Sequence, residues 1–160
     1  MGKIAIWGNS GTGKSITAKQ LGEKLGYQVV HLDDYLFING HYRTTSDFIQ
    51  TVSENLNKDN WIVEGLSYVK FDKQFTSVNK IIFLGLSNEI CIENIRKRGK
   101  REGQTDEEFE AFLQRVANFS FDYAREKLAP ATIPIYWLST TEEITDFIEN
   151  YPNVEKYLRK

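Results

Sequence analysis

Residues Gly8 to Ser15 read Gly-Asn-Ser-Gly-Thr-Gly-Lys-Ser and match the pattern G-x-x-x-x-G-K-[ST]. An apolar run over residues 3–7 precedes this segment, and a helical pattern begins at Lys14. In such a loop, consecutive backbone N–H groups turn inward around a phosphate at the N-terminus of a helix. The lysine reaches the β- and γ-phosphates, and the hydroxyl of the last residue reaches Mg²⁺. The sequence therefore predicts a nucleoside triphosphate site, with Mg²⁺ on Ser15. The residues expected to hold the nucleotide are Gly8, Asn9, Ser10, Gly11, Thr12, Gly13, Lys14, Ser15 and Ile16.

Strand-like and helix-like segments alternate along the chain. Apolar runs predict strands over residues 3–7, 28–32, 61–63, 80–84 and 132–138. Helical spacing predicts helices over residues 14–25, 46–57, 88–98 and 105–128, and a last helix that begins after Thr140. Capping boxes open the last two, Thr105 with Glu108 and Thr140 with Glu143. This order predicts a P-loop NTPase fold, a three-layer α/β/α arrangement with a five-stranded parallel sheet, in one domain over residues 1–160.

Composition narrows the class of protein. The 160-residue chain has a formal net charge of −2, which gives no overall attraction to nucleic acid or to an anionic membrane. Cys91 is the single cysteine; it excludes an intrachain disulfide and is interpreted as a packing residue. No apolar run approaches the roughly 18 residues that span a bilayer. Because the first predicted strand begins at residue 3, we expect no signal peptide. We expect a cytoplasmic protein, monomeric or homodimeric, with no membrane partner.

Carboxylates follow two of the predicted strands. Asp33 and Asp34 come after the second strand, and Glu64 comes after the third. Ligands of parallel α/β sheets bind beyond the carboxyl ends of the strands, so these acids are expected beside the phosphate loop. We predict that Asp33 orients or deprotonates a phosphate acceptor and that Glu64 supports Mg²⁺ through water. The alternatives are a helix cap or solvated turn for the aspartates, and an exposed acid beside the turn-forming Gly65 for Glu64.

The only dense run of charge covers residues 96–101, Arg-Lys-Arg-Gly-Lys-Arg. Because a glycine-containing stretch follows it, we predict a helical lid over about residues 99–128 that closes on the transferred phosphoryl group. Arg98 and Arg101 are its predicted catalytic arginines, and Arg115 is a further candidate for substrate binding. A solvated helix end explains part of the same charge. A nucleic-acid groove is not favoured, because the run contains no interleaved aromatic residues.

The chain resembles the small kinases of the adenylate kinase-like P-loop group, and most closely the proteins named DNA topology modulation proteins. The specific matches are residues 8–15, 31–33, 61–65 and 91–98. In similar uridine kinase-like proteins, a strand that ends in an acid followed by an aromatic residue supplies the catalytic base, which implies Asp33 rather than Asp34. The resemblance also implies two arginines four residues apart at the lid entry, which stack on adenine. Arg98 matches the second, Asn94 departs from the first, and Arg96 is the candidate substitute.

These features predict an ATP-dependent kinase that transfers the γ-phosphate to a hydroxyl or phosphate acceptor. The GTPase patterns D-x-x-G and N-K-x-D are absent, as is the glycine-rich acceptor loop of shikimate kinases. Arg43 lies where such kinases seat their acceptor, which favours a nucleoside, a nucleotide or a similar small molecule. The rival interpretations are an ATP-binding regulatory or nucleic-acid-associated protein with weak ATPase activity, and a polynucleotide 5′-kinase. The sequence does not identify the acceptor.

Overall fold

A computed structural model describes residues 2–38, 41–42, 54, 56, 59–65 and 78–159. Most of the helix predicted over residues 46–57 lies outside these described residues, as does the acceptor candidate Arg43. None of the helices in the described ranges is long and apolar enough to cross a membrane.

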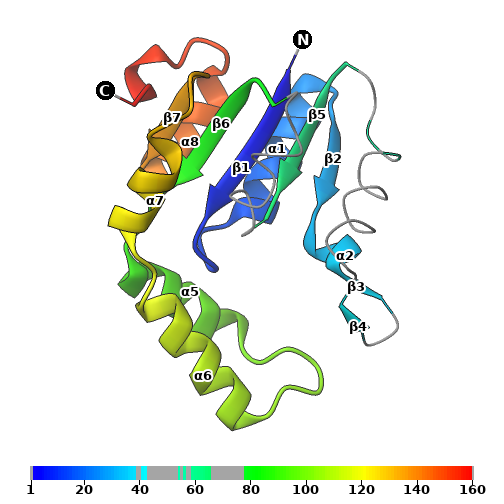
Figure 1. Cartoon of the computed structure of the whole chain (residues 1–160), viewed down its shortest axis with the longest axis vertical. Coiled ribbons are helices and arrows are strands. Elements are labelled where there is room, and N and C mark those ends of the chain that lie inside the picture. The colour runs from blue at the N-terminus through cyan, green and yellow to red at the C-terminus, as the bar shows by residue number, and fades with distance from the viewer. Residues whose placement is uncertain are drawn as a thin grey trace.

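Five parallel strands form the central sheet, as predicted (Figure 1). Its order is β2-β5-β1-β6-β7, and a separate antiparallel pair, β3 with β4, follows α2. The last strand of the central sheet, β7, begins at Ile135 and not at residue 132 as predicted. Pro134 has no N–H with which to continue the hydrogen-bond ladder. The strands are β1 (Lys3–Gly8), β2 (Gln28–His31), β3 (Phe37–Ile38), β4 (His41–Tyr42), β5 (Trp61–Glu64), β6 (Lys80–Leu84) and β7 (Ile135–Leu138).

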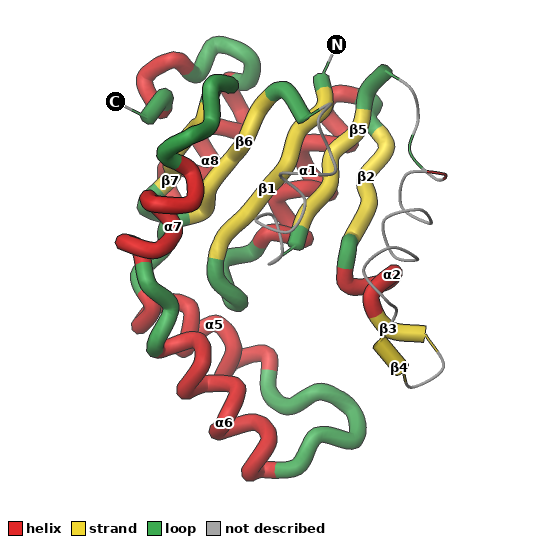
Figure 2. The backbone as a smooth tube through the Cα atoms, viewed as in Figure 1, coloured by secondary structure: helices red, strands yellow, loops and turns green. Residues whose placement is uncertain are grey.

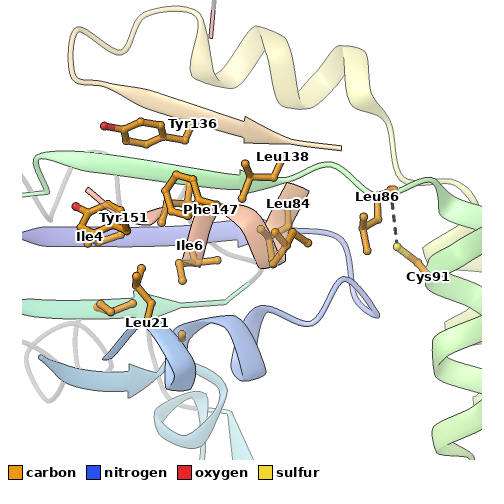
Figure 3. Packing of buried hydrophobic residues seen from close by; sticks show 14 of the residues in the cluster. Ile4, Ile6, Leu21, Leu84, Leu86, Cys91, Tyr136, Leu138, Phe147 and Tyr151 are labelled. Carbon is orange, nitrogen blue, oxygen red and sulfur yellow. Dashed lines mark hydrogen bonds between the residues drawn. The ribbon is translucent and has the colours of Figure 1, made fainter. Parts of the chain in front are cut away.

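Helices cover both faces of this sheet. Alternate side chains of β1 enter two different cores, Ile4 and Ile6 on one face and Ala5 and Trp7 on the other. The first core is closed by α1 (Lys14–Leu25) and α8 (Thr141–Asn150), and Figure 3 shows Leu21 and Phe147 packed there. The second core is closed in part by α7 (Phe121–Leu128). The three-layer α/β/α prediction is therefore confirmed.

Two helices project beyond the carboxyl ends of the strands, α5 (Asn88–Arg98) and α6 (Asp106–Ala117) (Figure 2). The short helix α2 (Asp33–Leu36) lies at the same end of the sheet, and a single 3₁₀ turn, η1 (Glu155–Tyr157), lies near the C-terminus.

The prediction of one helix over residues 105–128 is wrong. The chain breaks between α6 and α7 at Asn118–Ser120, where the Ser120 hydroxyl accepts a hydrogen bond from the amide of Tyr123 and so begins a new helix. The break turns Phe119 into the aromatic cluster on the sheet, 6.4 Å from Trp7 between ring centroids. Because α7 packs on the sheet, the part of the predicted lid that projects from it ends at Ala117.

Cys91 is fully buried in α5, and its thiol contacts the carbonyl of Leu86 at 3.9 Å (Figure 3). Burial raises the pKa of the Cys91 thiol to about 11, which opposes formation of the reactive thiolate. The packing interpretation of Cys91 therefore agrees with its position.

We expect native Cys91 to resist alkylation by iodoacetamide at about pH 8 and to react at least about 100-fold faster in concentrated urea. Because the pKa is raised in the fold, the stabilisation from the neutral thiol is complete below about pH 9 and is lost as the pH rises through about 11. Mass spectrometry of timed samples measures both rates. Equal rates in buffer and in urea would contradict the buried environment.

Candidate active site

The segment Gly8 to Ser15 forms a loop between β1 and α1. Gly11 and Gly13 both have a backbone φ of +84°, which residues with a Cβ rarely adopt. Two side chains of the loop hold the same carbonyl: the Thr12 hydroxyl donates to the oxygen of Asn9 at 2.8 Å, and the Lys14 ammonium donates to it at 2.7 Å. The loop therefore has a defined shape, held by its own hydrogen bonds.

Side chains from outside the loop add further restraints. The Asn94 amide of α5 donates to the carbonyl of Gly11 at 2.9 Å. Within the loop, the amide of Asn9 donates to the carbonyl of Val116 at the end of α6, also at 2.9 Å. Asn88 at the start of α5 donates to the carbonyls of Ala117 and Phe119. The loop, α5 and the break after α6 thus form one connected network.

Lys14 is only 9% exposed. Burial lowers the pKa of Lys14 below its usual value, and the negative charges of Glu64 and Asp33 act in the opposite direction. The nearby carboxylates therefore offset only part of the cost of burying the charged ammonium, and an anion bound in the loop would stabilise it.

Glu64 ends β5 and is buried, with 3% of its surface exposed. Its Oε1 accepts a hydrogen bond from the Ser15 hydroxyl at 3.0 Å and lies 2.8 Å from Nδ1 of His31. Glu64 is therefore not the exposed turn acid of the alternative interpretation. Sequence reasoning did not assign His31 a role, because its contact depends on the pairing of β2 with β5.

A cavity of about 700 Å³ opens beside the loop and joins most of the predicted residues. Asp33 lines it, whereas Asp34 does not. Strand β2 ends at His31, so both aspartates belong to the short helix α2 and not to an extended strand. The lining residues that were predicted as site residues are Ser10, Gly11, Thr12, Gly13, Lys14, Ser15, Ile16, Asp33, Glu64, Arg98 and Arg101. Gly8 and the buried Asn9 lie outside the lining.

The arginines differ in position. Arg98 and Arg101 line the cavity, and no carboxylate of the described residues pairs with either of them. The pKa of Arg98 is lowered, mainly by partial burial and then by the positive charge of Arg101. Arg115 lies over the ring of Phe112, with its guanidinium carbon 5.8 Å from the ring centroid, and does not line the cavity. Arg96 pairs with Glu110 of α6 at 3.4 Å and is likewise outside the lining.

The cavity also has apolar lining residues that sequence reasoning did not predict. Ile95 of α5 and Ile144 and Ile148 of α8 are among them, and Gln20 and Thr145 line the same cavity. A flat heterocycle with a few polar atoms suits such a lining. The residues could not be paired from sequence, since α5 and α8 are far apart along the chain.

The oxygen donors beside Lys14 suit Mg²⁺. Mg²⁺ prefers hard oxygen ligands and usually keeps several waters and phosphate oxygens in its shell. Because the Ser15 hydroxyl donates its hydrogen bond to Glu64, the lone pairs of its oxygen stay available to a cation. No group of three His, Cys, Asp or Glu side chains within the described ranges could hold a metal ion alone. Ser15 and Glu64 therefore fit an ion that arrives with a nucleotide.

Comparison with known proteins identifies the family. The model of the AAA domain family matches residues 4–113, a range that includes the phosphate loop, β5, α5 and most of α6. The chain belongs to the AAA domain family. Its predicted relationship to adenylate kinase-like P-loop proteins agrees with a curated relative from Pyrococcus abyssi named "Putative adenylate kinase", which is 31% identical over 119 residues. That alignment covers 69% of this chain and 63% of the relative, so this AAA-family chain spans less than two thirds of the relative's length.

Solved structures with the same fold include kinases. A deoxyadenosine kinase from M. mycoides has a TM-score of 0.56 at 17% identity, with 91% of this chain and 94% of that chain covered. A gluconokinase from Sinorhizobium meliloti has a TM-score of 0.56 at 16% identity, with coverages of 92% and 87%. At these identities the similarity establishes the fold, which is that of the P-loop NTPases.

We expect Gly11→Ala to destabilise the protein more than Gly26→Ala. Both glycines have positive φ, which costs an alanine roughly 1–2 kcal/mol. A Cβ at Gly11 would also lie 2.5 Å from the carbonyl oxygen of Cys91, whereas at Gly26 it would meet nothing within 4 Å. The contact should add about 1–3 kcal/mol to the loss in the free energy of unfolding, measured by urea denaturation. Equal losses for the two variants would contradict the close approach of α5 to the loop.

Proposed function

We propose that the protein is a small ATP-dependent kinase that transfers the γ-phosphate of ATP to a hydroxyl or phosphate acceptor. The observation that carries the proposal is that a single cavity is lined by the phosphate loop, the carboxylate Asp33 and the two arginines Arg98 and Arg101. Phosphoryl transfer needs these three kinds of group: a cradle for the phosphates, an acid that orients the acceptor, and positive charge for the transferred group. Membership of a P-loop family and the kinase relatives support the same reaction class.

The chemistry assigned to the cavity is an in-line displacement. The acceptor oxygen forms a bond to the γ-phosphorus while the bond from that phosphorus to the β–γ bridging oxygen breaks, and ADP leaves. For a hydroxyl acceptor, the proton passes to the carboxylate of Asp33. Lys14 compensates the phosphate charge, and Arg98 with Arg101 stabilises the additional charge of the transition state. The apolar lining residues Ile95, Ile144 and Ile148 suit the adenine base.

Mg²⁺ would be held by Ser15 directly and by Glu64 through water, and when bound it would neutralise charge on the β- and γ-phosphate oxygens. Within the protein, Glu64 keeps the Ser15 hydroxyl oriented.

The proposed acceptor is a small molecule, such as a nucleoside or a nucleotide. Arg43 is the predicted contact for an acceptor phosphate, and it lies outside the described residues. The narrower resemblance to proteins named DNA topology modulation proteins adds no chemistry to the proposal. A cytoplasmic location and a monomeric or homodimeric state stay predictions.

Asp33→Asn should abolish most acceptor-dependent turnover, while Asp34→Asn should leave it within about 3-fold, because only Asp33 lines the cavity. Loss of a general base typically costs 10²–10⁴-fold in rate, so we expect a decrease of that order in kcat for Asp33→Asn. The measurement is ADP production from Mg·ATP with a panel of nucleosides, nucleoside monophosphates, sugars and RNA 5′-ends. A thermal-shift screen with a non-hydrolysable ATP analogue selects the acceptors to test, since native-state ligands raise the melting temperature.

Other outcomes of this assay favour the rival functions. Acceptor-independent hydrolysis, or ATP binding without turnover, would contradict the kinase and favour a regulatory ATP-binding protein. Turnover that requires RNA or DNA 5′-ends and falls steeply with salt would favour a polynucleotide kinase.

The two arginine positions give a second test. Arg98→Ala should lower kcat by about 10²–10³-fold, the usual cost of removing a group that stabilises transition-state charge. Arg115→Ala is the matched variant, because Arg115 was predicted from sequence to bind substrate but lies outside the cavity lining. We expect less than about a 3-fold change in kcat/KM for Arg115→Ala. A loss like that of Arg98→Ala would restore the predicted role of Arg115, and normal activity of Arg98→Ala would remove Arg98 from the proposed reaction.

A further inference from the structure

His31 lies at the carboxyl end of β2, and the proposed reaction gives it no role. Parallel pairing of β2 with β5 sets His31 beside Glu64 in register. The ring nitrogen Nδ1 lies 2.8 Å from Oε1 of Glu64. An ionised carboxylate only accepts hydrogen bonds, so Nδ1 carries the hydrogen and His31 is the donor.

Two donors from different elements meet at the same carboxylate oxygen. Oε1 of Glu64 accepts from Nδ1 of His31 and from the Ser15 hydroxyl, which lies 3.0 Å away. In the described part of the chain, Oε2 of Glu64 has no hydrogen-bond partner. The Glu64 side chain is 4% exposed, so bulk water contributes little to its orientation. Among the described residues, these two contacts orient the carboxylate.

The orientation of Glu64 determines that of Ser15. While Glu64 accepts the hydrogen bond from the Ser15 hydroxyl, the lone pairs of the Ser15 oxygen stay free for a cation. If the carboxylate rotated, Ser15 would lose this acceptor and its hydroxyl hydrogen could point toward the ion. Hydrogen bonds to the side chains that ligate a metal ion influence the affinity for that ion. Removal of such a hydrogen bond typically lowers the metal affinity by about 10–100-fold.

We propose that His31 is a positioning residue for Mg²⁺: through its Nδ1–H it holds Glu64 in the orientation that presents the Ser15 oxygen and Oε2 of Glu64 to the hydrated ion. This inference rests on the proposed function, because it assumes that Ser15 and Glu64 serve the Mg²⁺ of Mg·ATP. His31 does not touch the nucleotide in this assignment. It acts only through Glu64.

The competing explanation is that His31 only joins the edge strand β2 to β5. A purely structural bond would change the stability of the protein without changing its response to Mg²⁺. The affinity for ATP in the absence of metal and the dependence of ATP binding on Mg²⁺ therefore separate the two roles.

The test uses the full chain and three variants. His31→Leu fills much of the ring volume without a donor, and His31→Ala removes the ring. His31→Asn keeps an N–H near the place of Nδ1. Calorimetry measures ATP binding with the metal chelated and then at increasing Mg²⁺, and electron paramagnetic resonance measures Mn²⁺ bound in the presence of ATP.

We expect His31→Leu and His31→Ala to bind metal-free ATP within about 2-fold of the wild type. The Mg²⁺ concentration that gives half-maximal enhancement of ATP binding should rise by about 10–100-fold in both. His31→Asn should return it to within about 3-fold of the wild type. If His31→Ala fails to fold, His31→Leu and His31→Asn carry the same comparison.

An unchanged Mg²⁺ dependence in His31→Leu would overturn the inference, even if its melting temperature fell. If His31→Asn needs as much Mg²⁺ as His31→Leu for half-maximal enhancement of ATP binding, the inference is overturned as well. The lost N–H donor would then not be the cause of the weaker Mg²⁺ response. Failure of the wild type to bind Mg·ATP would instead overturn the proposed function, whatever the variants do.

Discussion

Parallel pairing around β1 is the constraint on which the site depends. Strand β1 lies between β5 and β6, and its register with β5 sets Ile6 beside Glu64. The phosphate loop leaves the end of β1, so this register brings the carboxylate of Glu64 to the first turn of α1. The apolar cores on both faces hold the strands in this register, because a shift by one residue would exchange the side chains that face each core.

Buried polar groups at the end of the sheet are connected rather than isolated. Lys14 donates to the carbonyl of Asn9, and Glu64 accepts from Ser15 and His31. In a region of low dielectric such hydrogen bonds are strong, and removal of one partner leaves a costly unpaired group. Arg98 of α5 and Arg101 in the loop after it lack a carboxylate partner among the described residues, so positive charge in the cavity remains available for an anion.

The sequence was sufficient to predict the elements that depend on local patterns. The five strands of the central sheet follow from apolar runs, the loop follows from its motif, and helix α5 has the predicted bounds, residues 88 to 98. The short strands β3 and β4 were not predicted. Contacts between distant segments were not predictable, because no local pattern encodes the order β2-β5-β1 that joins His31 to Glu64. The break at Asn118–Ser120 was missed for a similar reason: helical spacing continues across it, and the packing of Phe119 on the sheet decides the turn.

The amides of Asn9 and Asn88 bind main-chain carbonyls at the end of α6 and not its side chains. Every amino acid supplies such a carbonyl, so substitutions of the residues at positions 116, 117 and 119 leave these bonds possible, whereas substitution of either asparagine removes them. Changes on the exposed face of α6 therefore leave these main-chain bonds in place. The restraint that α6 places on the loop of residues 8–15 thus depends on the path of its backbone and not on the chemistry of its exposed side chains.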